Sequence, residues 1–585
     1  MSVTRQRTLE ALRTQPFDLL VVGGGIVGTG IARDAALRGF RVAIVEQHDF
    51  ASGTSSRPTR LIHGGLRYLE NYDFGLVRED LREREILLRV APHLVFPLPF
   101  LLPQYGRSAF FQAKLRAGMH LYDALSYDKS LPGHRWLSRR EVLETEPGMD
   151  PNGLQGAWRY FDAQVPFVER LVVENVLDAA RHGAMVLNHA RVERFARAPG
   201  GDGLRHAPVT GAVVRDLLGS GEVEVRAHVT VNATGPWLDM TDGEIRPGRP
   251  PLLRLTKGVH LVTPSGTRHA HVLFSQTDGR LFFVVPWLGY SLVGTTDTDY
   301  QGDPAEVAAD LEDVRYLSTE ARRAFPRAPF DRVHYTWAGV RALVRVEGVK
   351  EGQVSRKHRV LDHETREGVP GIVSVVGGKI TAYRGIAEEV GNLVSAKLGQ
   401  RTRSYTDRRP FPGGALGRET DLSAYVASQL WPRARALGLT YDQVWRLGGI
   451  YGALAHDILE LAERDRVLAA PLAPGCPAIG AELVRAVEQE WTGTLGDFLL
   501  RRSDLGLQAQ QALGSVEHIA THMAALRGWD ATEREAQVAR YLAEIEPMRR
   551  LSTAPVDSSA RVGERNGAPG GAVDLPRGAG TPFPS

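Results

Sequence analysis

Residues 17–46 constrain the fold of this chain more than any other stretch. They read FDLLVVGGGIVGTGIARDAALRGFRVAIVE. Two apolar runs, at 19–22 and 41–45, are too short for helices and rich in β-branched residues, so they predict buried strands. The segment 26–37 between them predicts a helix that ends at Gly39. Strand, glycine-rich turn, helix and strand in this order predict a βαβ unit and an α/β fold.

The glycines of the turn follow the G-x-G-x-x-G spacing that is typical of dinucleotide-binding sites. Gly23 allows a tight turn, Gly25 lets the backbone approach a pyrophosphate, and Gly28 lets the helix pack on the strand. The pyrophosphate is expected at the helix N-terminus, at Ile26, where free N–H groups and the helix dipole favour anions. Glu46, at the end of the second strand, suits a ribose hydroxyl. A plain βαβ unit with a glycine turn is the alternative, and the motif alone does not separate NAD from FAD.

The polar stretch 51–70, ASGTSSRPTRLIHGGLRYLE, directly follows this unit and is too irregular for a core element. Its hydroxyl and basic side chains suit hydrogen bonds to phosphate or to the edge of a flavin. His63 adds a titratable ring beside flexible glycine backbone, and Arg67 adds a cation. A surface loop with a hydrogen-bonded histidine is the alternative, which the position directly after the nucleotide motif disfavours.

The composition is that of an ordinary soluble globular protein and excludes several classes of site. The 585 residues are 43% hydrophobic and 24% charged, with a formal net charge of +3. This charge is too mild to predict a nucleic-acid partner. The single cysteine, Cys476, excludes an intramolecular disulfide and a cysteine metal cluster, and we expect no metal. No apolar h-region opens the chain and no run reaches the ~18 apolar residues that span a bilayer, so neither a signal peptide nor a transmembrane helix is expected.

Longer strings along the chain are more specific than the nucleotide motif. Together they resemble the FAD-dependent glycerol-3-phosphate dehydrogenases, which belong to the D-amino-acid-oxidase-like flavoproteins. The resemblance covers about residues 17–541. The matching strings are SSRPTRLIHGGLRYLE from Ser55, REREILLRVAPHLV from Arg82, LPG from Leu131, YFDAQV from Tyr160, NATGPW from Asn232, GTTDT from Gly294, WAGVRAL from Trp337, SR from Ser355 and GGKITAYR from Gly377.

The expected fold class is α/β, with a discontinuous Rossmann-like FAD-binding domain, an antiparallel-sheet substrate domain and a C-terminal all-helical domain. Alternating polarity over 252–298 predicts the antiparallel sheet, and helical periodicity over 422–550 predicts the last domain. A Gly-, Pro- and Ser-rich composition at the C-terminal end predicts disorder. The expected division is an FAD-binding domain at 17–100, 156–245 and 356–400, a helical, membrane-contacting segment at 101–155, the substrate domain at 246–355, the helical accessory domain at 410–550 and a disordered tail at 551–585.

A helix is expected within 104–128, with apolar side chains on one side and basic ones around it. Such a helix can lie in a membrane interface or pack on the protein core. The resemblance favours the membrane, because the bacterial dehydrogenases of this family are peripheral membrane enzymes that reduce quinone. It implies a cytoplasmic protein at the inner face of the cytoplasmic membrane and leaves a homodimer open. The residues concerned are Phe111, Leu115, Met119 and Tyr122 on the apolar side, with Arg107, Lys114, Arg116 and His120 among the charges.

The resembled reaction, oxidation of the C2 alcohol of glycerol 3-phosphate, needs a hydride acceptor, which non-covalently bound FAD supplies. It also needs groups that hold the phosphate, and arginine suits a phosphate dianion because it binds bidentately. His63 is the expected base, since the ordinary pKa of histidine is about 6.5. An alkoxide assisted by arginine or lysine is the alternative. The resemblance implies a substrate-binding set of Arg67, Tyr68, Arg341, Arg356 and Lys379, and a catalytic set of His63, Arg67, Arg341 and Lys379.

Cofactor contacts are expected from the nucleotide motif, from the polar loop after it, from the NATGPW turn and from the Gly-Gly turn that opens the last helix of the FAD-binding domain. Three functions remain open: a quinone-reducing dehydrogenase, a soluble oxidase of the same family that reduces O2 to peroxide, and a catalytically silent flavoprotein that senses a phosphorylated ligand. The expected cofactor-binding residues are Gly23, Gly25, Ile26, Gly28, Glu46, Thr54, Ser55, Ser56, His63, Gly64, Gly65, Gly235, Gly378, Lys379 and Thr381.

Overall fold

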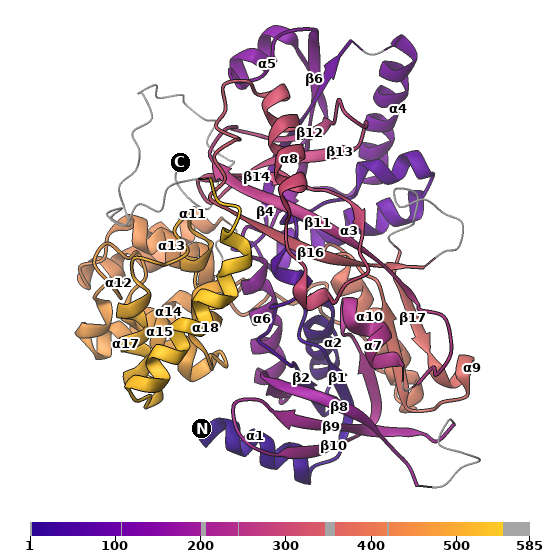
Figure 1. Ribbon diagram of the computed structural model, residues 1–585, viewed down its shortest axis with the longest axis vertical. Coiled ribbons are helices and arrows are strands. Elements are labelled where there is room, and N and C mark those ends of the chain that lie inside the picture. The colour runs from indigo at the N-terminus through magenta and orange to yellow at the C-terminus, as the bar shows by residue number, and fades with distance from the viewer. Residues whose placement is uncertain are drawn as a thin grey trace.

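The computed structural model describes residues 3–106, 108–199, 206–243, 245–345, 357–417 and 421–553. Figure 1 shows three parts: a parallel-centred sheet with helices in the lower half, a second sheet in the upper half, and the C-terminal helices, orange to yellow, beside both. The expected α/β fold class with a helical C-terminal domain is confirmed. The disorder expected at 551–585 falls on residues that, from 554 onward, lie outside the described part.

The lower sheet has eight strands, with the order β17-β18-β10-β1-β2-β7 and β8 and β9 paired beside β10. Strands β1 and β2 are parallel, and the helix between them spans the predicted residues, so the βαβ unit is confirmed. The strands are β1 (Phe17–Val22), β2 (Val42–Val45), β7 (Met185–Leu187), β8 (Ala190–Arg197), β9 (Val209–Asp216), β10 (Glu222–Asn232), β17 (Arg359–Asp362) and β18 (Ile372–Val376). The helices of this part are α1 (Val3–Thr14), α2 (Ile26–Leu37), α6 (Val168–Arg181), α7 (Leu238–Asp242), α9 (His363–Glu367) and α10 (Tyr383–Lys397).

The upper sheet has ten strands, and all of its pairs are antiparallel except β4 with β12. The strands are β3 (Leu61–Ile62), β4 (Phe96–Tyr105), β5 (Arg135–Ser138), β6 (Leu154–Gln164), β11 (Leu253–Pro264), β12 (Ala270–Phe274), β13 (Leu281–Trp287), β14 (Tyr290–Gly294), β15 (Thr298–Asp299) and β16 (Tyr335–Val344). Helices α3 (Phe74–Val90), α4 (Ala109–Leu125), α5 (Arg139–Thr145) and α8 (Leu311–Ala324) flank it.

The upper sheet includes strands from outside residues 246–355, the range expected for the substrate domain. Strand β4 crosses the boundary expected at residue 100, and β6 lies in a stretch expected to bind FAD, yet both belong to the upper sheet. The prolines of β4 are typical of an edge strand. They are tolerated inside the sheet because β12 pairs only with Phe100 and Leu101, so Pro97 and Pro99 need no N–H on that side.

Helix α4 faces both the protein core and the solvent. Its side chains Met119 and Tyr122 are buried, as the predicted apolar side requires. On other sides Phe110 is 80% exposed and Leu121 is 37% exposed. The helix therefore packs on the core with one side and leaves large apolar side chains uncovered on another.

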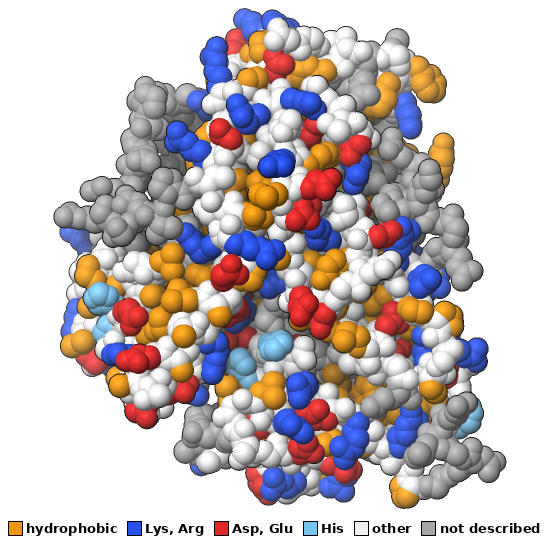
Figure 2. Space-filling model, viewed as in Figure 1, with side chains coloured by type: hydrophobic (Ala, Val, Ile, Leu, Met, Phe, Trp, Pro, Cys, Tyr) orange, Lys and Arg blue, Asp and Glu red, His pale blue; other side chains and the backbone are white. Residues whose placement is uncertain are grey.

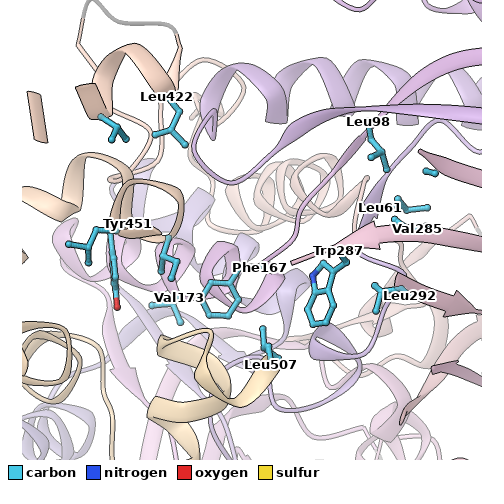
Figure 3. Close-up of a cluster of buried hydrophobic side chains, with 14 of the residues drawn as sticks. Leu61, Leu98, Phe167, Val173, Val285, Trp287, Leu292, Leu422, Tyr451 and Leu507 are labelled. Carbon is cyan, nitrogen blue, oxygen red and sulfur yellow. The ribbon is translucent and has the colours of Figure 1, made fainter. Parts of the chain in front are cut away.

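The C-terminal domain consists of helices joined by turns and loops, and its described residues form no strand apart from one isolated β-bridge. Its hydrophobic core continues into the upper sheet and α6, where Leu422, Tyr451 and Leu507 share a buried cluster with Trp287 and Val173 (Figure 3). None of the helices in the described part of the chain combines the length and low polarity that crossing a bilayer requires. The helices are α11 (Leu422–Tyr425), α12 (Trp431–Ala436), α13 (Tyr441–Tyr451), α14 (Ala455–Arg464), α15 (Gly480–Gln489), α16 (Leu495–Asp497), α17 (Val516–Arg527) and α18 (Ala531–Arg549), with π-helical turns η6 (Val426–Leu430) and η9 (Phe498–Arg502).

Candidate functional site

A cavity of about 520 Å³ lies between the two sheets. One wall is built from residues that follow the carboxyl ends of β1, β2, β10 and β18, where open α/β sheets bind their ligands. The other wall comes from β11 and β16 of the upper sheet. The cavity therefore joins the nucleotide motif to the antiparallel sheet.

The glycine turn leaves its backbone open to this cavity. Gly23 has a φ of +109°, and a Cβ there would lie 2.6 Å from the carbonyl oxygen of Ala233. A Cβ on Gly28 would lie 2.0 Å from the Gly23 carbonyl oxygen, so this glycine serves the packing of α2 on the turn. Gly25 starts α2 without a side-chain cap. A helix N-terminus bounded by glycine backbone fits the pyrophosphate of a dinucleotide.

Ser55 and Glu46 complete this end of the cavity. The Ser55 hydroxyl accepts a hydrogen bond from the Ile26 amide at 3.0 Å, which ties the polar loop to the start of α2. The Glu46 carboxylate accepts from the amides of Gly24 at 2.6 Å and His48 at 2.8 Å. Burial raises the pKa of Glu46 above its ordinary value. The acid thus lies at the end of β2, facing the cavity, as the motif predicts.

Arg341 lines the cavity from β16, in the wall that the upper sheet forms. Its guanidinium donates to Asp297 at 3.0 Å, to the hydroxyl of Thr295 at 2.7 Å and to the carbonyl of Thr296 at 3.1 Å. A Cβ on Gly258 of the neighbouring strand would lie 2.2 Å from the guanidinium, so the glycine makes room for it. The GTTDT string therefore holds Arg341 in one orientation beside the cavity.

His260 is a site residue that the sequence reasoning missed. It lies on β11, is buried, lines the cavity and shares a 2.8 Å hydrogen bond with the Thr59 hydroxyl. Burial lowers its pKa to about 3, and the charges of Arg341 and Arg60 act in the same direction. The ring is therefore neutral at physiological pH. The alternation of side chains along β11 could have indicated this residue, because His260 lies on the same face of the strand as Gly258, two residues before it.

The Lys379 side chain contacts the backbone of His63. Its ammonium donates to the His63 carbonyl at 2.6 Å and to the carboxylate of Asp80 at 2.8 Å, and it lies 5.3 Å from the centre of the Tyr68 ring. The His63 amide donates to the Thr381 hydroxyl at 3.1 Å. The Gly-Gly turn and the polar loop, more than 300 residues apart, are thus joined at the cavity.

The structure brings most of the predicted residues to the cavity, but not all of them. Ser56 instead donates to the Ala51 carbonyl, and the Gly64 amide donates to the Tyr122 hydroxyl behind the wall. The side chain of Arg67 and all of Arg356 lie outside the described part. Predicted residues that line the cavity are Gly23, Gly25, Ile26, Glu46, Thr54, Ser55, His63, Gly235, Arg341, Gly378 and Lys379. Predicted residues that do not line it are Gly28, Ser56, Gly64, Gly65, Tyr68 and Thr381.

Comparison with known proteins agrees with this geometry. Residues 18–384 match the family of FAD dependent oxidoreductases, and residues 404–534 match the C-terminal domain of alpha-glycerophosphate oxidase. A protein of Synechocystis sp. named glycerol-3-phosphate dehydrogenase is 37% identical over 92% of this chain and 97% of its own. The aerobic glycerol-3-phosphate dehydrogenase of Staphylococcus haemolyticus is 34% identical over 86% of this chain and 89% of its own.

A solved structure is similar over nearly the whole chain. It is the X-ray structure of the glycerol-3-phosphate dehydrogenase from Bacillus halodurans complexed with FAD, with a TM-score of 0.74 and 29% identity, covering 96% of this chain and 99% of that one. The family match spans more than half of the chain, and both curated relatives are matched over most of their length. The chain therefore belongs to the FAD-dependent glycerol-3-phosphate dehydrogenases, within the FAD-dependent oxidoreductases, and FAD is its cofactor.

Proposed function

We propose that this protein oxidises sn-glycerol 3-phosphate to dihydroxyacetone phosphate and passes the electrons through FAD to a membrane quinone. The observation that supports this most is one cavity lined both by the glycine turn of an FAD site and by two cations, Arg341 and Lys379. The names of the curated relatives supply the substrate.

Bound FAD supplies the hydride acceptor for the reaction. The proposed contacts to its pyrophosphate and ribose come from Gly25, Ser55 and Glu46, which line one end of the cavity. Gly235 and Gly378, after β10 and β18, are proposed to border its ring system. Gly235 and Gly378 carry no side chain, which leaves room for a flat cofactor.

The substrate phosphate is assigned to Arg341 and Lys379. Arg341 is fixed by Asp297, and Lys379 by Asp80, so neither cation must reorganise when an anion arrives. Arg67, Tyr68 and Arg356 belong to the same proposed set through the family resemblance. Preorganised cations favour a phosphate ester over a neutral polyol.

His63 is proposed as the base that takes the hydroxyl proton, because it lines the cavity beside the Lys379 contact. An alkoxide stabilised by Lys379 and Arg341 is the alternative route. His260 is a poorer base, since its lowered pKa disfavours the protonated ring. It is assigned to orienting the substrate with Thr59.

The membrane face is assigned to α4 and the start of α3. Exposed aromatic side chains lie there at Tyr72, Phe110 and Tyr127, and the exposed cations Lys114 and Arg116 accompany them. Apolar side chains mixed with cations suit the headgroup region of an anionic bilayer. This surface would place the protein peripherally on the inner face of the cytoplasmic membrane.

One experiment on the FAD-loaded protein tests both the electron acceptor and the membrane location. We expect it to sediment with anionic liposomes and to reduce a soluble quinone analogue when glycerol 3-phosphate is added. Turnover with O2 that releases one peroxide per substrate, without liposome binding, would instead establish the soluble oxidase, which the match of residues 404–534 to an oxidase domain keeps as a second candidate. Tight binding of glycerol 3-phosphate without turnover would establish the silent, phosphate-sensing flavoprotein.

A further inference from the structure

The C-terminal domain contacts the cofactor loop that follows β2. Residues Glu46, Gln47, His48, Ser52 and Gly53 of this loop line the cavity. Asp49, between them, is not among the described cavity-lining residues and its side chain has no exposed surface. The loop thus has one face toward the cofactor and one buried anchor behind it.

Two consecutive arginines of the C-terminal domain hold this anchor. Arg501 donates through Nε to Asp49 at 2.6 Å. Arg502 donates from both terminal nitrogens to the two carboxylate oxygens of Asp49, at 2.8 and 2.7 Å. Both arginines come from the π-helical turn η9, a rare geometry that is frequent at functional positions. A bidentate arginine–carboxylate pair fixes orientation as well as distance.

The same junction is closed by further contacts. The Phe50 and Trp491 rings meet edge to face with centroids 6.3 Å apart. Asn188 donates both to Asp49 at 3.0 Å and to the Trp491 carbonyl at 2.8 Å. Figure 2 shows this face of the molecule, where histidine side chains lie in the hollow between the C-terminal helices and the lower part.

The carboxylates around Asp49 do not suit a metal ion. Ligand atoms of Asp49, His189 and Asp497 lie within 4.8 Å of one another. Both carboxylates already accept hydrogen bonds from arginine, Asp49 from two and Asp497 from Arg501. Two buried guanidinium groups would repel a cation at the same place. The cluster is therefore a closed ion-pair network that joins two domains.

We propose that the C-terminal helical domain acts as a clamp on the cofactor loop, with Asp49, Arg501 and Arg502 as positioning residues for FAD. The clamp fixes Asp49 so that Glu46, three residues before it, and Ser52, three residues after it, keep their places at the cavity wall. The network also reaches the cavity electrostatically, since Arg501 and Glu544 contribute to the pKa of Arg57, which lines the cavity and whose pKa is lowered mainly by burial. This inference rests on FAD as the cofactor and is independent of the electron acceptor.

Coupling between two sites is reciprocal, so FAD must stabilise the clamp if the clamp stabilises FAD. Hydrogen–deuterium exchange of the full chain without and with FAD tests this in the wild type. We expect FAD to slow amide exchange in η9 (Phe498–Arg502), although no residue of η9 lines the described cavity, and to leave α14 (Ala455–Arg464) unchanged. Protection of residues 46–56 with no change in η9 would overturn the proposal.

Arg502→Lys keeps the charge and removes the bidentate pair. Arg446→Lys is the matched control, because Arg446 is equally part of a buried network, with Glu482 and Asp504, but lies inside the C-terminal domain. We expect Arg502→Lys to raise the Kd of the apoprotein for FAD at least about fivefold, and the control to change it less than about twofold. Equal effects of the two variants, or no effect of Arg502→Lys, would overturn the clamp. Arg501→Lys, which leaves the bidentate pair in place, serves as the second variant if Arg502→Lys does not fold.

Discussion

The Lys379 ammonium lies 2.8 Å from the carboxylate of Asp80, a side chain with no exposed surface. A second hydrogen of the same nitrogen goes to the His63 carbonyl. The ammonium also lies 5.3 Å from the centre of the Tyr68 ring, and the Lys379 side chain lines the cavity. Lys379 is therefore held as a hydrogen-bond donor, which suits an oxygen of the substrate.

Replacing Asp80 with Asn should change how stability depends on pH. Burial raises the pKa of Asp80 to about 6, against an ordinary 3.8, despite the attraction of Lys379 and with added repulsion from Glu79 and Glu83. A raised acid pKa means that the native state binds the proton more tightly, so the free energy of unfolding falls as pH rises from about 4 to 6, by about 3 kcal/mol. The Asp80→Asn variant has no carboxyl to titrate, so its free energy of unfolding should not fall in this way. Urea unfolding should show that the difference in free energy of unfolding between variant and wild type rises by that amount, in favour of the variant, between pH 4 and 7.

Asp128→Asn is the control for that measurement. The pKa of Asp128 is lowered, chiefly by its hydrogen bonds to Arg78, so its ionised form stabilises the native state above the ordinary pKa. Its variant should lose stability relative to wild type as pH rises. Parallel pH curves for Asp80→Asn and wild type would contradict the raised pKa of the buried Asp80 carboxyl.

Replacing Arg341 with Ala should raise the KM for glycerol 3-phosphate while FAD content stays normal. A hydrogen bond to a charged group contributes about 1.5–3 kcal/mol, which corresponds to about 10- to 150-fold in KM. Steady-state kinetics and the flavin-to-protein absorbance ratio measure the two quantities. Arg254→Ala is the control, because Arg254 pairs with Asp299 in the same sheet and is not among the described cavity-lining residues. Loss of FAD from Arg341→Ala would show that this arginine serves the cofactor instead.

The two histidines of the cavity should differ in their effect on the pH profile. A base must be unprotonated, so kcat/KM falls on the acid side as the base gains its proton. His63→Asn should remove this acid limb. His260→Asn should lower the rate at every pH and keep the limb, because burial already holds His260 neutral, with a pKa of about 3. The reverse pattern would reassign the base.

Replacing Gly23 with Ala should abolish FAD binding. The new Cβ would lie 2.6 Å from a backbone oxygen at a φ of +109°. Gly39 is the control, since its φ of +90° gives similar strain but its Cβ would meet nothing within 4 Å. Gly39→Ala should lose only about 1–2 kcal/mol of stability and keep its flavin, as absorbance of the purified proteins would show. Normal FAD content in Gly23→Ala would contradict the glycine turn as the cofactor site.

Local pattern predicted the nucleotide half well. The apolar runs around Gly23, Gly25 and Gly28 are short and strongly patterned, so strand, turn and helix follow from neighbouring residues alone. The same holds for residues 168–181, whose pattern predicts a helix with the bounds that α6 has in the structure. Glu46 could be placed because one turn and one helix fix where the second strand ends.

Pairings between strands that lie far apart in the sequence could not be predicted from local pattern. His260 faces the site only because β11 pairs with β16 in one register, opposite Trp337. Opposite charges at helical spacing over 77–89 favour a solvated helix face, and only the packing of α3 against the Gly-Gly turn reveals the contact of Asp80 with Lys379. The clamp on Asp49 joins residues more than 450 positions apart, which no local pattern encodes.

Anaerobic titration of the purified, FAD-loaded protein with sn-glycerol 3-phosphate tests the central claim most directly. The account predicts that the visible absorbance of oxidised FAD bleaches completely at about one equivalent of substrate, and that a quinone analogue restores it. An FAD-loaded protein whose absorbance does not change with glycerol 3-phosphate would contradict it.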